Sequence, residues 1–173
     1  LFAPTSLAAL ELGSAVHALF EEVEWSNHAD PEAAIAAARA RIVCPEAVWE
    51  AAAGQLRASL AAVAVQTALA LPEGNAELWR ERNFEALVEG HWVSGCFDRV
   101  HLVRDDAGLP RAATILDYKT SNLDRDGALA EALAHYRPQM DLYRKVLAQL
   151  IGLDEGVIEL KLIFTRAGLV EKL

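Results

Sequence analysis

The spacing of hydrophobic residues differs between the two halves of the chain. In the first half, apolar side chains recur every three or four positions, as they do along the buried face of an amphipathic helix. This spacing predicts helices over residues 5–26, 31–43 and 45–71. Thr5 or Ser6 is expected to cap the first helix, because a hydroxyl at that place accepts a hydrogen bond from an otherwise unpaired backbone N–H.

In the second half, the spacing changes to the alternation that is typical of half-buried strands. It predicts three consecutive strands, over residues 78–90, 91–105 and 111–121. A helix is expected over residues 127–151, divided at Pro138 so that its main part begins near Arg137. Residues 156–168 are expected to form a final strand. This order of helices, strands, helix and strand predicts an α+β fold.

Length and composition are those of one globular domain. We expect a single domain over residues 1–173, with a mainly helical segment over 1–77 and a core of sheet and helix over 78–173. No apolar run approaches the roughly 20 residues of a membrane span. The only methionine is Met140, so the chain lacks an initiator methionine, and we expect it to be part of a larger polypeptide.

The number and spacing of the cysteines limit the cellular compartment and the kinds of metal site that the sequence allows. The chain has two cysteines, Cys44 and Cys96, and neither belongs to a C-x-x-C pair. A site made of four cysteines is therefore excluded within these residues, and a reducing cytoplasm is the natural interpretation.

The net charge of −9 argues against a simple nucleic-acid binder, which normally carries a basic surface. The acidity is uneven, however. Residues 1–79 hold three basic residues and ten acids, whereas residues 80–173 hold thirteen basic residues and fifteen acids. The second half is thus near neutral, and some of its acids are candidates for metal ligation. We expect an isolated chain of this charge to bind DNA weakly and with strong salt sensitivity.

An acid and a lysine lie close together in "ILDYKTS", residues 115–121. If this segment is a strand, Asp117 and Lys119 point to the same face. Asp98 lies on the preceding strand, and a hairpin of this length can place both carboxylates at the same level of the sheet. Two such acids repel each other unless a cation lies between them, and Mg²⁺ or Mn²⁺ suits oxygen ligands. Taken alone, the Asp–Lys pair is more simply a surface ion pair.

Four further residues allow both an ordinary and a functional interpretation. His17 is a core or surface histidine, or a metal ligand on the first helix. Gln139 and Tyr143 share one face of the last helix, where they either lie on its surface or face the site. Glu81 is a charged strand residue or a supporting residue beside the site.

These fragments together resemble a known family. The ordered segments "GSAVH", "ERNFEALVEGHWVSGCFDRV", "ILDYKTS" and "YRPQMDLY" are similar to the RecB-type nuclease domain of the PD-(D/E)XK superfamily. Such domains lie at the carboxyl end of bacterial helicase–nucleases such as RecB and AddA. The resemblance implies a restriction-endonuclease-like core, in which a mixed β-sheet is flanked by helices and preceded by a helical segment.

The resemblance also implies the site residues. By analogy with the family, His17, Asp98, Asp117 and the main-chain carbonyl of Tyr118 bind the divalent metal, Mg²⁺ or Mn²⁺. Lys119 serves the attacking water. We expect the ion to polarise the phosphoryl oxygen and to lower the pKa of the water.

The remaining motif residues are implied with less definite roles. Gln139 and Tyr143 match the Q-x-x-x-Y pair of this branch, and Glu81 matches a glutamate whose role is less settled. Ser14 and Asn83 stand where many members have threonine and proline, which leaves the ligand set intact. Without the four cysteines of some relatives, the chain resembles the branch that has no iron–sulfur cluster.

The expected function is therefore that of a metal-dependent exonuclease module in DNA recombination and repair. Its partners would be DNA and helicase domains, in the same chain or in another subunit. One alternative is a catalytically silent module that anchors DNA or a partner. A second is an unrelated α+β protein, in which His17, Asp98 and Asp117 would lie far apart.

Overall fold

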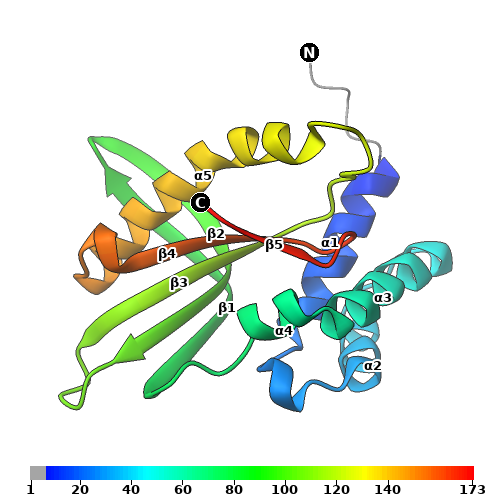
Figure 1. The fold of residues 1–173 in the computed structure, drawn as a ribbon, viewed down its shortest axis with the longest axis horizontal. Helices are drawn as coiled ribbons and strands as arrows, with labels where there is room; N and C mark the ends of the chain where they lie inside the picture. The colour runs from blue at the N-terminus through cyan, green and yellow to red at the C-terminus, as the bar shows by residue number, and fades with distance from the viewer. Residues whose placement is uncertain (1–6) are drawn as a thin grey trace. The chain divides into compact units, whose positions relative to one another are not determined.

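The structure is a computed structural model that describes residues 7–173. Its residues form two compact units. The first unit contains the described residues up to Ala70, together with Tyr118–Thr120 and Phe164–Leu169. The second unit contains Leu71–Asp117, Ser121–Ile163 and Val170–Leu173. Both units are drawn in Figure 1.

The first unit is helical, as the three-residue and four-residue spacing predicts. Its helices are α1 (Leu7–Glu21), α2 (Pro31–Arg41), α3 (Glu46–Ala61) and α4 (Val63–Ala68), with a 3₁₀ turn, η1, at Ser26–His28. The predicted cap, Thr5 or Ser6, lies outside the described residues. The first helix ends at Glu21 rather than at residue 26. The third predicted helix is two helices, because Ala62 has extended backbone angles that interrupt the hydrogen-bonded turns.

The apolar stripes of these helices make the core of the first unit. Val16, Leu19 and Phe20 of α1 are fully buried, and α1 packs against α3, which buries Trp49 and Leu56. Helix formation places apolar side chains of this spacing on one face, where packing buries them. The burial therefore stabilises both the helix and the unit.

The second unit is built on a mixed five-stranded sheet with the order β1-β2-β3-β4-β5. The strands are β1 (Asn75–Val88), β2 (His91–Arg104), β3 (Pro110–Lys119), β4 (Ile158–Phe164) and β5 (Leu169–Lys172). The helix α5 (Ala128–Ile151) and the turn η2 (Glu155–Val157) connect β3 to β4. The predicted α+β class, with an amino-terminal helical segment, is confirmed. Among the helices of residues 7–173, none combines the length and the hydropathy needed to cross a bilayer.

Two expectations about the second unit differ from the structure. The strand expected over residues 156–168 is β4, and it is not the last strand, because β5 follows it; four residues after a turn carry too short a pattern to be recognised. Pro138 does not divide the last helix, since α5 is continuous for 24 residues with Pro138 inside it. A proline removes one backbone hydrogen bond, and the buried Met140, Val146 and Leu147 supply packing that offsets this loss.

The β1–β2 hairpin has one face packed against α5. Phe84 of β1 and Phe97 of β2 contact the ring of Tyr143 edge-on, with centroid separations of 5.2 Å and 5.4 Å. Gly95 lies beneath this cluster. A Cβ atom at Gly95 would lie 2.6 Å from Cζ of Phe84 and 3.2 Å from the hydroxyl of Tyr143. The glycine is therefore required by close packing, and its φ angle plays no part.

We predict that Gly95→Ala lowers the free energy of unfolding by about 1–3 kcal/mol, because the added methyl overpacks the aromatic cluster. Urea denaturation measures the effect. The matched control is Gly54→Ala in α3, where an added Cβ meets nothing within 4 Å. That change should raise stability by about 0.5–1 kcal/mol through helix propensity. Equal effects of the two substitutions would contradict the packing argument.

A hydrogen-bonded pair of polar side chains is buried on the same face of β2. Arg99 is completely buried, and its Nε donates a hydrogen bond to Nε2 of His101 at 2.6 Å. Burial lowers the pKa of His101 to about 3, and the cations Arg99 and Lys161 lower it further. The imidazole therefore stays neutral and accepts the hydrogen bond, which a protonated ring could not do.

This arrangement predicts a loss of stability in acid. The pKa of His101 is lower in the folded chain than in the unfolded chain, so its contribution is present above about pH 6.5 and is lost as the pH falls toward 3. We expect the free energy of unfolding at pH 5 to be about 2 kcal/mol lower than at pH 8 because of this group alone. In His101→Gln, which keeps an acceptor but does not titrate, the difference between the two pH values should shrink by that amount.

Candidate metal centre

Two acids face each other across the first pair of strands. In the β1–β2 register Arg80 pairs with Arg99, so the next residues along the two strands, Glu81 and Asp98, lie opposite one another. A carboxylate oxygen of Glu81 and one of Asp98 lie within 4.8 Å of each other. Asp98 is only 8% exposed. Two carboxylates this close, one of them buried, repel each other unless a cation or a proton is shared.

A third acid extends this row onto β3. The β2–β3 ladder ends where Arg99 pairs with Leu116, so one further residue along both strands brings Asp117 opposite Asp98. Asp117 is 2% exposed. Directly opposed residues of neighbouring strands share a face. Glu81, Asp98 and Asp117 therefore form one row across three strands, which we call the acid row.

The backbone of Glu81 is unusual. Its φ angle is 45°, in the left-handed region that side chains other than glycine seldom adopt. Such a conformation costs about 1–3 kcal/mol and occurs preferentially at functional sites. Its Oε2 also lies 3.6 Å from Sγ of Cys96, the next residue toward the hairpin tip on the same face. The strand thus holds the Glu81 carboxylate beside Asp98 at some cost in stability.

The donor atoms of the acid row fit a hard divalent cation. Oxygen ligands lie about 2.0–2.6 Å from Mg²⁺ or Ca²⁺, so two oxygens on one ion are at most about 5.2 Å apart. The separation between the Glu81 and Asp98 oxygens is within this limit. Carboxylates are the ligands that Mg²⁺ and Mn²⁺ prefer.

In the first unit, His17 lies against the end of β3. Its Nε2 is 3.2 Å from the carbonyl oxygen of Tyr118, and its ring meets the Tyr118 ring edge-on at 5.8 Å. The Tyr118 ring is buried and stacks on Phe20 of α1 at 4.5 Å. These contacts fix the carbonyl that follows Asp117 in the chain. The predicted residues His17 and Tyr118 are therefore in contact.

Lys119 is the last residue of β3, two positions after Asp117. Its carbonyl accepts a hydrogen bond from the backbone N–H of Thr165 at 3.0 Å. Thr165 is fully buried, and its own carbonyl accepts a bond from the hydroxyl of Ser59 at 2.8 Å. Sequence reasoning missed Thr165 and Ser59 as positioning residues. Neither lies in a motif, so the sequence carried no signal for them.

Gln139 and Tyr143 lie one turn apart on α5, where Nε2 of Gln139 donates to the hydroxyl of Tyr143 at 3.1 Å. Tyr143 packs on Phe97. Because Phe97 and Asp98 are consecutive in a strand, their side chains point to opposite faces. The structure therefore places the Tyr143 ring on the face opposite to the acid row, and a contact of this pair with DNA stays a prediction.

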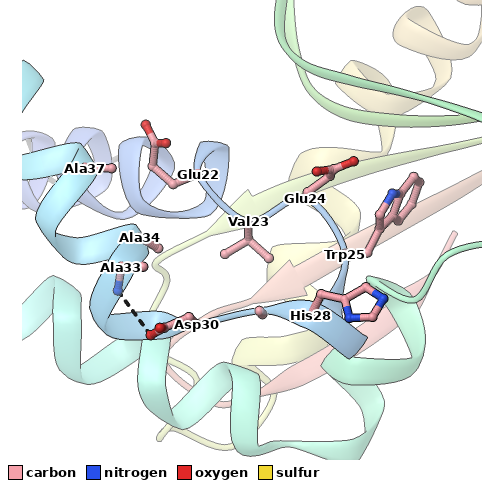
Figure 2. Close-up of a pocket in the computed structure, with 10 residues that line it drawn as sticks. Glu22, Val23, Glu24, Trp25, His28, Asp30, Ala33, Ala34 and Ala37 are labelled. Atoms are coloured by element: carbon pink, nitrogen blue, oxygen red, sulfur yellow. Dashed lines mark hydrogen bonds between the residues drawn. The ribbon is translucent and has the colours of Figure 1, made fainter.

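A pocket of about 410 Å³ lies elsewhere, between the end of α1 and α2 (Figure 2). Its floor is formed by alanines of α2 and by Val23, and none of the predicted site residues lines it. Two of its acids have local roles. Asp30 accepts hydrogen bonds from the first N–H groups of α2, and Glu22 pairs with Arg41 at 2.7 Å. Among the residues that the structure describes, the lining of this pocket includes no cluster of three or more side chains close enough to share a metal ion.

The repulsion within the acid row predicts stabilisation by divalent cations. A cation that binds only the folded chain raises its stability according to its affinity. We expect Mn²⁺ in excess over its Kd to raise Tm by several degrees in the unsubstituted chain, and Asp98→Asn to abolish the shift. The control Glu85→Gln removes an exposed acid of β1 that faces Ser94 rather than another acid. A shift that survives in Asp98→Asn would contradict this assignment.

Comparison with known proteins agrees with this geometry. No curated protein matches the chain. A family model described as the PD-(D/E)XK nuclease superfamily matches residues 3–171. Members of this superfamily are generally nucleases that use divalent metals, and the carboxylate oxygens of the acid row suit such ions. From the matched length and the acid row together, we conclude that the chain belongs to the PD-(D/E)XK nuclease superfamily.

Proposed function

We propose that this chain is a metal-dependent deoxyribonuclease domain, with its two units acting as one nuclease domain. The observation that carries the proposal is the acid row, which brings Glu81, Asp98 and Asp117 onto one face of the sheet in a member of this superfamily. The substrate is DNA, and the reaction is hydrolysis of a phosphodiester bond.

Asp98 and Asp117 are the principal carboxylate ligands for Mg²⁺ or Mn²⁺, with Glu81 in support. His17 and the Tyr118 carbonyl complete the ligand set. Two observations support them. Tyr118 follows Asp117 directly in the chain, and the imidazole of His17 lies 3.2 Å from the Tyr118 carbonyl oxygen. Two ligand atoms that each lie about 2.1 Å from one ion, at right angles to each other, are about 3 Å apart, so this separation suits two ligands of the same ion.

The ion, when bound, supplies Lewis acidity at the phosphate and makes water more acidic. The chain supplies orientation and charge. Lys119 points to the same face as Asp117, where its ammonium positions the water and balances the charge that develops on the phosphate oxygens. The backbone bond from Thr165 to the Lys119 carbonyl holds the main chain at this position.

We further propose that the domain acts as the exonuclease module of a RecB- or AddA-like helicase–nuclease in DNA recombination and repair in the cytoplasm. The order of the four motifs supports this context. A net charge of −9 also supports it, because such a surface attracts DNA poorly and needs helicase domains to deliver the strand.

The test is cleavage of single-stranded and double-stranded DNA with Mg²⁺ or Mn²⁺. We expect Asp117→Ala and Lys119→Ala each to lower kcat at least about 100-fold, since each removes preorganised charge at the reacting phosphate. The matched controls are Asp126→Ala and Lys145→Ala. Asp126 is exposed, and Lys145 forms a surface pair with Glu89 at 2.6 Å.

The controls should retain full activity. Equal rates in all variants would refute the assigned roles. A chain that binds Mn²⁺ by calorimetry but cleaves neither form of DNA would instead be a silent nuclease-like module.

A further inference from the structure

One face of the β1–β2 hairpin continues the acid row toward the hairpin tip. In the β1–β2 register three cross-strand pairs follow Glu81 and Asp98 on the same face. We call them the hairpin strip, and they are Asn83–Cys96, Glu85–Ser94 and Leu87–Trp92. The opposite face of the hairpin packs against Tyr143 of α5 through Phe84 and Phe97. The hairpin therefore uses one face for packing and turns the other, polar face to solvent.

The strip ends in an exposed aromatic side chain. Trp92 is 79% exposed, and its partner Leu87 is 48% exposed. Folding gains little from an indole that stays mostly in water, because the hydrophobic gain follows the area that is buried. Trp25, Trp49 and Trp79, by contrast, are all buried. Trp92 is thus the one tryptophan of residues 7–173 whose ring is mostly accessible to a ligand.

A hollow lies on the part of the hairpin between the acid row and Trp92. It has a volume of about 610 Å³ and is lined by Asn83, Phe84, Glu85, Ser94, Gly95 and Cys96. Asp98 and Trp92 are six residues apart on β2, and a strand advances about 3.3 Å per residue, so about 20 Å separates them. The side chains between them are small or polar. The strip therefore extends from the acid row to the exposed ring of Trp92.

We propose that the hairpin strip binds single-stranded DNA and leads it to the acid row, with Trp92 stacking on a base about 20 Å from Asp98. This inference rests on the proposed nuclease function and names the form of its substrate. Base stacking on aromatic side chains is the usual way to hold a single strand without sequence preference. In a duplex the faces of the bases stack on neighbouring bases, so the Trp92 ring is expected to select an unpaired strand.

The strip suits a nucleic acid better than a protein partner. Its apolar part is a single Leu87–Trp92 pair, whereas a stable protein interface buries about 800 Å² on each partner. Glu85 is the one charged member of the strip, and it repels phosphate. The sugar–phosphate backbone is therefore expected on the β2 side, near the hydroxyl of Ser94.

Binding is tested with a fluorescently labelled oligothymidylate in EDTA, where no cleavage occurs. Trp92→Ala should bind about tenfold more weakly, within the range measured for loss of one stacked base. Trp92→Phe should bind nearly as well as the unsubstituted chain, and Glu85→Gln should bind more tightly. The matched control is Leu109→Ala, a change at a residue that is 62% exposed in the connection between β2 and β3. It should leave binding unchanged.

A second measurement separates stacking from general damage to the site. Bis(p-nitrophenyl) phosphate is too small to reach from the acid row to Trp92. Trp92→Ala should therefore cleave it with unchanged kcat/KM, while its KM for the oligonucleotide rises about tenfold. The unsubstituted chain must cleave both substrates with Mn²⁺, and failure to do so would count against the proposed function itself.

Two outcomes would overturn the inference while leaving the nuclease function intact. In the first, Trp92→Ala binds and cleaves the oligonucleotide like the unsubstituted chain, which would assign the exposed pair to protein docking instead. In the second, Trp92→Ala loses activity equally toward both substrates, which would assign Trp92 a structural role. An oligonucleotide that protects the exposed indole from acrylamide quenching supports stacking, and unchanged quenching contradicts it.

Discussion

Electrostatic repulsion among carboxylates on one face of the sheet is the constraint on which the candidate site depends. Glu81, Asp98 and Asp117 come from three neighbouring strands, and the last two are nearly excluded from water. Burying several like charges together is unfavourable unless a cation compensates them. The fold accepts this cost, along with a left-handed backbone at Glu81, and the family to which the chain belongs explains why.

Alternate side chains of β2 serve stability and the proposed chemistry. The side chains of Phe97 and Arg99 point into packed surroundings, whereas Asp98 between them points to the acid row. Gly95 lets the Tyr143 ring approach β2, so α5 supports the hairpin from the face that carries no ligands. Changes on the packed face are thus expected to alter the position of Asp98 without touching its carboxylate.

The part of the candidate site that the sequence could predict is the facing of acids on neighbouring strands, because its motifs are local. Period-two alternation predicts that Asp117 and Lys119 share one face, and this stays a prediction. It also made Asp98 the natural partner across the hairpin, and the register agrees. The continuous α5 and the strand β5 were not predicted, because burial against the sheet overrides the local cost of Pro138 and because four residues carry too little pattern.

By itself, the sequence determined the α+β class, the order of the elements apart from the division between α3 and α4 and the strand β5, and the residue types that can bind a divalent cation. These properties depend on the period of hydrophobic residues and on side-chain chemistry, and a short segment of the sequence carries both by itself. Tertiary structure alone decided the contact between His17 and the Tyr118 carbonyl, the support of Lys119 by Thr165, and the exposure of Trp92. Each of these depends on segments far apart in the chain, or on which face of a hairpin a helix covers, and no local pattern encodes that choice.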